Sequence, residues 1–343
     1  MTDLLPHSDL RTVVPDDVSS GCGAAVMLGA DSPRTRALLA SLHGRTGVAP
    51  FIASPEVVVL DLLDGRAAAG FTQVGRWAIS PGEPVAPRHL FESALGEYLD
   101  RIACLRLRPA FMAVSDPTPF TARGMAVQEV ADEAVVDLAS FTLAGSARAN
   151  VRHAVSSARR HGLMFAAFHR GMTGQLREIS ESWLATKRGG ELGFTLSRHD
   201  DVAYQLEEGA TDLWTVLDAS GQVQAWCTWR HYLGGTGRVI DVMRRRPDAP
   251  NPAMDFLLAS SLETYRDQGL RLASLASVPR PHGELAERIY PTKTLRAYKQ
   301  KFAPRWERRW LAVPKPRQAP FAMMAISRAY CPGGLGRALR RNG

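Results

Sequence analysis

The sequence predicts an α/β protein made of two tandem copies of one unit. The order hairpin, strand, loop, helix, strand occurs once in each half of the 343-residue chain, although the residues themselves do not repeat. Such a repeated order of elements is typical of a duplicated α/β unit. Apolar residues make up 45% of the chain and charged residues 22%, which is enough for buried cores in two domains of ordinary size. We expect these domains over residues 1–165 and 166–343.

The first copy is recognised by its hairpin. Asp64 and Gly65 form a predicted tight turn between two apolar runs. A helix with three leucines on one face is expected before it. In chain order, the predicted elements are a helix over 32–43, strands over 56–63, 67–71 and 73–79, a helix over 88–102 and a strand over 110–115.

The second copy has the same order of elements. Its helix is expected to begin at Asn251, a good N-cap, because Pro252 suits the first helical position. In chain order, the predicted elements are strands over 213–217, 223–232 and 238–243, a helix that ends at Gly269 and a strand over 272–277.

Charged residues interrupt the strand before this helix. In the segment 237–255, GRVIDVMRRRPDAPNPAMD, Asp241 and Arg244 stand among apolar strand residues, and Arg245 extends the positive charge. An Asp and several Arg residues at a strand end, facing a helix N-terminus, predict a site for an anionic or polarised ligand. The alternative is an ordinary strand–loop–helix unit with a surface ion pair, which contributes little stability.

The chain is basic, with a formal net charge of +8. This excess predicts an anionic partner, which is nucleic acid, a phosphorylated substrate or an anionic membrane surface. Arg148, Arg152 and Arg159 recur at helical spacing, and within the run 296–317 only Glu307 opposes the basic residues. The alternative for such a stripe is a solvated helix face.

The sequence also argues against several classes of site. The four cysteines are far apart and no pair has CxxC spacing, so no zinc site is expected, and dispersed free thiols fit a reducing cytosol. The dinucleotide, P-loop, zinc-protease and serine-hydrolase motifs are absent. We therefore expect no metal and no cofactor, and catalysis by positioning and electrostatics.

The expected location is mainly cytosolic. The sequence has no stretch of about 18 uncharged apolar residues, and its N-terminus lacks the features of a signal peptide. Over 319–341, apolar residues alternate with arginines. We favour a terminal helix packed on the second domain, and the alternative is a salt-sensitive peripheral contact with the inner face of the membrane.

Three segments follow one another in a specific order. They are WLATKRGGELGFTLSRHD at 183–200, then DVMRR, PDAPN and MDFLL within 241–258, then LRAYKQKFAPRWERRWL at 295–311. In this order they resemble the catalytic domain of lysylphosphatidylglycerol synthases, also called multiple peptide resistance factors. The resemblance covers residues 56–311. The chain departs from the usual pattern at Thr195, Ser197-Arg198 and Pro252-Ala253, and it lacks the large membrane-embedded half of those enzymes.

The resemblance implies a fold of two tandem acetyltransferase-like (GNAT-like) domains. It also implies transfer of an aminoacyl group from aminoacyl-tRNA to an acceptor hydroxyl. The loop before the Asn251 helix lacks the glycine-rich pyrophosphate motif of acetyl-CoA enzymes with this fold, which agrees with that activity. By position, the implied catalytic residues are Glu191, Asp241 and Arg244, and the implied substrate contacts are Lys301, Asp255, Phe194 and Arg245. The resemblance and the two basic stretches together predict tRNA contacts at Arg148, Arg152, Arg159, Lys299 and Arg305.

The implied roles follow from the charges. Glu191 and Asp241 are candidates to hold the α-ammonium of the donor, and one of them to accept the hydroxyl proton, a role worth ~10²–10⁴ in rate. Arg244 and Lys301 are candidates to stabilise the oxyanion or to hold a terminal tRNA phosphate. The structural alternatives are an interdomain salt bridge for each charged residue, a favourable helix-dipole contact for Asp255, and a core position for Phe194.

The acceptor and two other functions stay open. Because the membrane-embedded half is missing, our main expectation is a small hydroxylated metabolite of a natural-product pathway. The alternative is phosphatidylglycerol or another lipid at the membrane surface. An acyl-CoA-dependent N-acyltransferase is a second alternative. A non-catalytic RNA- or membrane-binding protein is a third, but it does not explain an Asp and a Glu among apolar strand residues.

Overall fold

The computed structural model describes strand β1 (Met27–Leu28), residues 44–186, 193–198, 202 and 206, and residues 209–280 and 292–330. The predicted helix over 32–43 and the candidate Glu191 lie outside this part of the chain.

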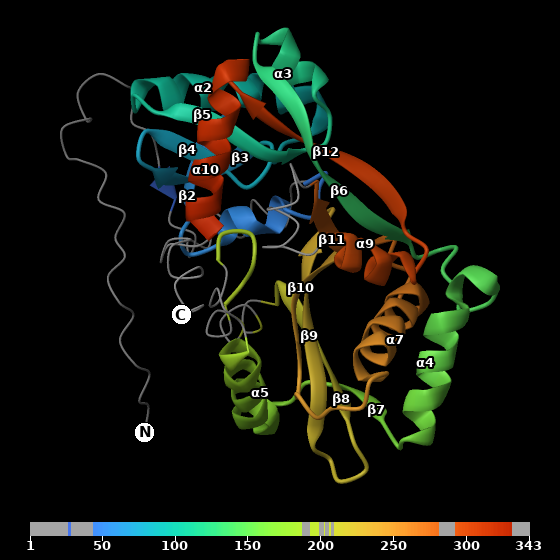
Figure 1. Ribbon diagram of the computed structural model, residues 1–343. Coiled ribbons are helices and arrows are strands. Elements are labelled where there is room, and N and C mark those ends of the chain that lie inside the picture. Colours follow the sequence, from blue (N-terminus) through green and yellow to red (C-terminus); the bar gives the residue numbers. More distant parts are fainter. Residues whose placement is uncertain are drawn as a thin grey trace.

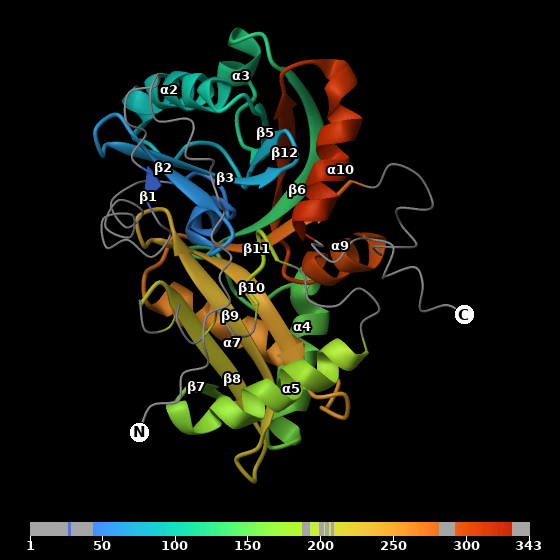
Figure 2. The same ribbon diagram turned by 90° about the vertical axis from the view of Figure 1, so that its left-hand side faces the viewer.

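A single twelve-stranded sheet runs through both halves of the molecule (Figures 1 and 2). Its strand order is β1-β2-β3-β4-β5-β12-β6-β11-β10-β9-β8-β7. The strands of the first half are β2 (Val58–Leu62), β3 (Ala67–Val74), β4 (Trp77–Ser80), β5 (Arg108–Val114) and β6 (Ala126–Asp137). The later strands are β7 (Met164–Ala167), β8 (Thr211–Leu217), β9 (Val223–Tyr232), β10 (Gly237–Arg245), β11 (Leu272–Pro279) and β12 (Arg305–Val313).

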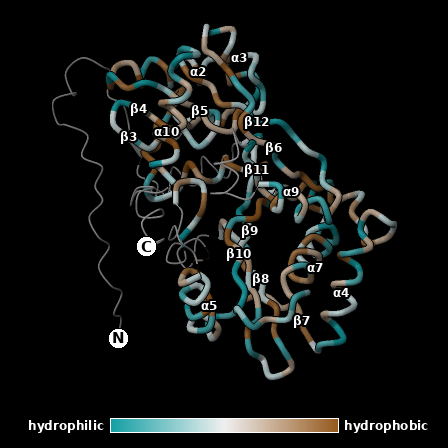
Figure 3. The backbone as a smooth tube through the Cα atoms, in the orientation of Figure 1, coloured by the Kyte–Doolittle hydropathy of each residue, from teal (hydrophilic) through white to brown (hydrophobic). Residues whose placement is uncertain are grey.

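Helices cover both faces of this sheet. In the first half, α2 (Phe91–Cys104) and α3 (Thr118–Ala122) pack on one face and α10 (Ala319–Tyr330) on the other. In the second half, α4 (Ala149–Arg160) and α7 (Ala253–Asp267) lie on one face and α5 (Thr173–Ala185) on the other, while α9 (Thr292–Gln300) lies beside β11. Hydrophobic stretches alternate with hydrophilic ones along the strands between these helices (Figure 3), and nearly all of β9 is buried.

The repeated order of elements is confirmed. In each copy the strand before the central helix pairs in parallel with the strand after it, as β4 with β5 and β10 with β11. Two predicted boundaries were wrong. The strand over 73–79 is broken, because Gly75 turns the chain at a positive φ of 59°. The helix α7 begins after Pro252, so Asn251 is not its cap.

The two ends of the described chain meet in the first half. Strand β12 lies between β5 and β6, and α10 packs on β3 and β4, not on the second domain as predicted. Conversely, α4 from the first 165 residues packs on α7. The predicted domain boundary at residue 165 stays a prediction. Helix α4, which precedes residue 165, packs in the second half, and β12 and α10, which follow it, pack in the first half.

A buried ion pair joins the strands at the centre of the sheet. Glu133 on β6 accepts a hydrogen bond of 2.7 Å from Arg309 Nε on β12, and both side chains are 2–3% exposed. The carboxylate also accepts bonds from the Ser274 hydroxyl on β11 and from the Gly47 backbone N–H. A Cβ at Gly47 would lie 2.5 Å from Glu133 Oε1, so this close approach requires glycine.

Strands β10 and β11 part after a short parallel pairing. They pair only from Gly237 to Val239 on β10, although both strands continue. Lys299 of α9 reaches the parting strand β11, and its Nζ donates to the carbonyls of Ala276 (2.9 Å) and Ser277 (3.1 Å). Lys299 is 5% exposed, and burial lowers its pKa to about 7. The prediction that Lys299 contacts tRNA was therefore wrong, because the amine is buried and bonded to the backbone.

We predict that Lys299 makes stability depend on pH. The folded-state pKa of about 7 lies below the ordinary value of 10.5 for a lysine, so between these two pH values the unfolded chain binds more protons. The free energy of unfolding should rise from pH 7 to pH 9, by up to about 1.4 kcal/mol per pH unit. Urea denaturation at both pH values should show that Lys299→Met removes this increase, while the exposed-site control Lys315→Met retains it. Equal slopes in all three proteins would contradict the assignment.

One cysteine differs from the expectation that all four are free thiols. Cys227 is a buried free thiol, but Cys104 takes part in a disulfide, so the expectation of free thiols fails there. Over the described residues, no helix is long and apolar enough to cross a membrane.

Candidate functional site

A bulge in β10 turns Asp241 away from the main core. The pairing with β9 shifts between Ile240 and Met243, and both of these side chains pack on the α7 side. Val242 packs instead with α5. Asp241 faces the loop after α5, where its Oδ1 accepts a hydrogen bond of 2.9 Å from the Ser197 backbone N–H.

One oxygen of Asp241 is left without a hydrogen-bond donor. The residue is 8% exposed, and Oδ2 is buried and has no hydrogen-bond partner. Burial raises the pKa of Asp241, while the charges of Arg230 and Arg244 and the bonds from Ser197 act to lower it. A buried acceptor without a partner is costly, which is why such groups are rare outside functional sites. The geometry suits a cationic donor group of a ligand.

Two arginines flank this carboxylate. Arg230 donates to the Pro50 carbonyl at 3.1 Å, and its guanidinium carbon lies 5.2 Å from the centre of the Phe51 ring. Arg244 is buried and stacks on Trp183 of α5, at 3.9 Å from the ring centre. Both guanidinium groups are fixed in place by aromatic rings, as expected for preorganised cations.

Asp255 and Lys301 lie apart from Asp241, on the α7 and α9 side of the sheet. Lys301 Nζ is 2.9 Å from Asp255 Oδ2 and 4.8 Å from the centre of the Tyr298 ring. The Lys301 side chain is 33% exposed and that of Asp255 13%. Arg245 is half-buried at the end of β10. Burial raises the pKa of Tyr298, and the charge of Arg245 acts in the opposite direction. The structure therefore separates the predicted residues into an Asp241–Arg244 group and an Asp255–Lys301 group with Arg245 near it.

Phe194 is a core residue, so its prediction as a substrate contact was wrong. It is fully buried, at a positive φ of 69°, and packs edge-to-face on Tyr330 of α10. Its backbone N–H donates to Glu56 at 2.5 Å. Phe194 thus holds the loop that carries Ser197 against the first half, which positions Asp241 indirectly.

The predicted tRNA contacts differ in their surroundings. On α4, Arg152 donates to the carbonyls of Leu143 (2.7 Å) and Gly145 (2.9 Å), and Arg148 lies over Phe141. Both residues therefore have structural roles, whereas Arg159 is exposed. Arg305 is exposed and pairs with Glu307.

The basic run over 296–317 is less free than the sequence suggested. Carboxylates on β6 oppose it, because Asp132 pairs with Arg296 and Glu129 with Arg308. Arg280, directly after β11, pairs with both carboxylates. These partners are more than 140 residues away in the sequence, so a local charge count could not find them.

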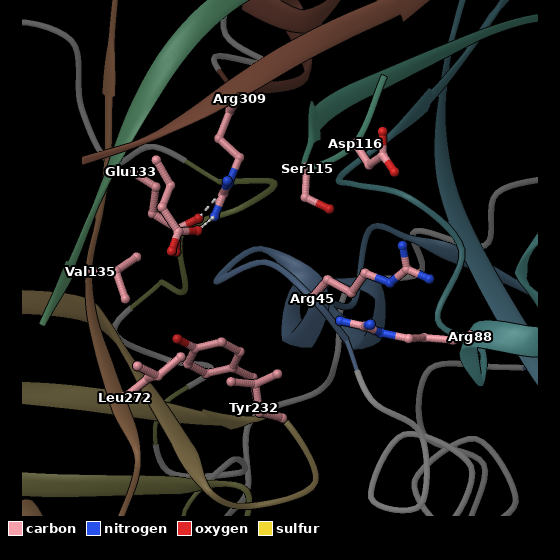
Figure 4. Close-up of a pocket in the computed structure, with 11 residues that line it drawn as sticks. Arg45, Arg88, Ser115, Asp116, Glu133, Val135, Tyr232, Leu272 and Arg309 are labelled. Carbon is pink, nitrogen blue, oxygen red and sulfur yellow. Dashed lines mark hydrogen bonds and ion pairs between the residues drawn. The ribbon is translucent and has the colours of Figure 1, made fainter. Parts of the chain in front are cut away.

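Sequence reasoning also missed a polar pocket between the two halves. It has a volume of about 470 Å³ and includes the Glu133–Arg309 pair in its wall. Figure 4 shows Arg45 and Arg88 entering it from the first half and Tyr232 from the second. Its residues lie far apart in the sequence and form no motif. Among the described residues, no group of three or more His, Cys, Asp or Glu side chains is arranged to hold a metal ion.

Comparison with known proteins agrees with this fold. Residues 36–313 match the family described as "Phosphatidylglycerol lysyltransferase, C-terminal". The phosphatidylglycerol lysyltransferase of Bacillus subtilis strain 168 is 27% identical over 288 residues, which are 77% of this chain and 33% of that protein. The chain thus spans about a third of the length of that curated relative.

Two solved structures are similar over most of the chain. One is the C-terminal domain of a protein described as a lysylphosphatidylglycerol synthetase from Agrobacterium fabrum, with a TM-score of 0.78, 26% identity, and coverage of 88% of this chain and 97% of that one. L-PGS from Bacillus licheniformis shares the fold, with a TM-score of 0.77, 23% identity and the same coverage. The tandem acetyltransferase-like α/β fold is thereby confirmed. With the family match extending over most of its length, this chain belongs to the phosphatidylglycerol lysyltransferase C-terminal family.

Proposed function

We propose that this chain transfers an aminoacyl group from aminoacyl-tRNA to a hydroxyl of phosphatidylglycerol. The observation that carries the proposal is the buried, unbonded Oδ2 of Asp241 between two fixed arginines. The family match supports it, and so does the name of the Bacillus subtilis relative.

The aminoacyl ester of the donor is already activated, so the protein mainly has to position the donor and the acceptor. The α-ammonium of the donor binds Asp241 and donates to Oδ2 the hydrogen bond that this oxygen lacks. The acceptor oxygen attacks the ester carbonyl, the bond to the tRNA ribose breaks, and the hydroxyl proton ends on the ribose oxygen. Arg244 stabilises the negative charge that develops on the carbonyl oxygen. Arg245 and Lys301 hold a phosphate near the tRNA 3′ end, and the exposed Arg159 and Arg305 contact the tRNA body.

The acceptor in this proposal differs from our first expectation. The relatives are named for phosphatidylglycerol, and none of the comparisons supports a small metabolite, so the lipid alternative is preferred. The acyl-CoA alternative has no observation in its favour, because residues 246–252 before α7 contain no glycine. A non-catalytic binding protein would leave the buried Asp241 oxygen unexplained.

An exposed strip of α10 fits contact with a lipid surface. Phe321 is 59% exposed and Met324 49%, and both point outward from a helix without acidic residues. Arg328 is exposed on α10 one turn after Met324, and Arg317 is exposed in the 3₁₀-helix Pro316–Gln318 that precedes α10. Apolar side chains flanked by cations suit an anionic bilayer, where each cation contributes about 1 kcal/mol. We include this peripheral contact in the proposal.

Asp241→Asn tests the donor site. The measurement is transfer of labelled amino acid from a mixed aminoacyl-tRNA pool into the lipid extract of phosphatidylglycerol vesicles. Loss of a buried charge contact costs about 2–5 kcal/mol, so kcat/KM should fall at least about 30-fold. Because burial raises the pKa of Asp241, the variant should melt no lower than wild type.

The control is Asp248→Asn, which makes the same charge change at an exposed position after β10. It should retain near-normal transfer. Normal transfer by Asp241→Asn would remove Asp241 from the site, and a large loss of stability would favour a structural ion pair. Labelled product in an added soluble acceptor, with none in lipid, would overturn the lipid assignment.

Phe321→Ser/Met324→Ser tests the membrane contact. Co-sedimentation with phosphatidylglycerol vesicles should fall several-fold, because both apolar anchors are lost. The control is Met164→Ser on β7, since Met164 is equally exposed (50%) but lies far along the sheet. If all three proteins sediment alike, α10 is not the lipid-binding surface.

A further inference from the structure

The pocket beside Glu133 borders the same short segment as the donor site. Gly47 contacts Glu133 in the pocket wall, and Pro50 contacts Arg230, which acts on Asp241. Residues 47–50 therefore contact both the wall of the pocket and the surroundings of Asp241. A volume of about 470 Å³ is within the usual range for small-ligand sites.

Two cations in this pocket lack counter-ions. Arg45 and Arg88 both enter the cavity (Figure 4), and within the described residues neither forms an ion pair or a side-chain hydrogen bond. Arg45 is steadied by the Phe91 ring, 4.5 Å from its guanidinium carbon, and Arg88 is exposed. Guanidinium groups with free donors match the oxygens of a phosphate in shape and charge.

The other charges of the pocket are already paired. Arg309 bonds both Glu133 and Glu307, and Glu307 also bonds Arg305. The remaining charged groups that line the pocket are Arg45, Arg88 and the carboxylate of Asp116. Hydrogen bonds from Thr118 and the charge of Arg45 lower the pKa of Asp116. Arg45 also acts on the buried carboxyl of Glu83, but burial raises the pKa of that group and so favours its neutral form. The two arginines therefore face one negative charge and favour a ligand that carries one more.

Hydroxyl-binding groups lie next to these arginines. The Ser115 hydroxyl donates to Glu83 at 2.8 Å, so its lone pairs are directed to other partners, and the Asp116 carboxylate is exposed. A ligand that combines one anionic phosphodiester with free hydroxyls would use every one of these groups. This combination is the headgroup chemistry of a glycerophospholipid with a glycerol head.

We propose that Arg45 and Arg88 bind the phosphodiester of the acceptor headgroup, with Ser115 and Asp116 accepting hydrogen bonds from its glycerol hydroxyls. The proposal deepens the proposed function and rests on it for the identity of the ligand. The same two arginines would also take a free phosphate, so the test separates the two sources.

The test is equilibrium binding to the full chain by calorimetry, without tRNA. The probes are dihexanoyl phosphatidylglycerol below its critical micelle concentration, dihexanoyl phosphatidylcholine and inorganic phosphate. Arg45→Gln and Arg88→Gln should each weaken binding of the phosphatidylglycerol at least tenfold. The control Arg76→Gln makes the same charge change at an exposed position between β3 and β4 and should bind as wild type. Phosphatidylcholine should bind at least tenfold more weakly, because its headgroup carries a cation and no hydroxyls.

Three other results of these binding and transfer measurements would decide against part of the proposal. Unchanged binding by Arg88→Gln, whose exposed side chain is not needed for folding, would overturn the proposal. Inorganic phosphate that binds as tightly as the lipid would overturn the headgroup assignment. If wild type binds the lipid through both arginines but transfers no amino acid to it, the proposed function fails while the pocket assignment stands.

Discussion

The buried pair of Glu133 and Arg309 is the contact on which the rest of the structure depends. It joins β6 to β12 and, through Ser274 and Gly47, fixes β11 and the segment before the short 3₁₀-helix Ala49–Ala53. Removing one partner of such a pair costs about 3–5 kcal/mol, because the other charge stays buried. Strand β6 pairs with β12 on one side and with β11 on the other, so this contact lies where the ladders of the two copies of the repeat meet in a single sheet.

The candidate site follows from that arrangement. The segment held by Glu133 also meets Arg230, and the loop of Phe194 and Ser197 is fixed to α10, which packs on the first half. Asp241 therefore takes its surroundings from both copies, although it lies on β10. A buried carboxylate oxygen without a donor destabilises the empty protein, and the same cost becomes binding energy when an ammonium group fills the site.

The sequence allowed the local elements to be predicted better than their assembly. Strand β9 has the predicted bounds, and the apolar run with Asp241 and Arg244 led to the candidate strand. Short-range patterns decide such features. The position of β12 between β5 and β6, the pairing of Arg296 with Asp132 and the burial of Lys299 depend on contacts between distant parts of the chain. Arg45 and Arg88 could not be predicted as pocket residues for the same reason. The residues of this pocket come from separate segments of the chain and form no motif with a fixed spacing.

The most direct measurement is a crystal structure with a non-hydrolysable lysyl-adenosine, in which an amide replaces the ester at the ribose 3′ position. We expect the α-ammonium nitrogen to lie within about 3.2 Å of Asp241 Oδ2, with the carbonyl oxygen directed toward Arg244. An α-ammonium bound elsewhere, with Asp241 Oδ2 still lacking a donor, would contradict it.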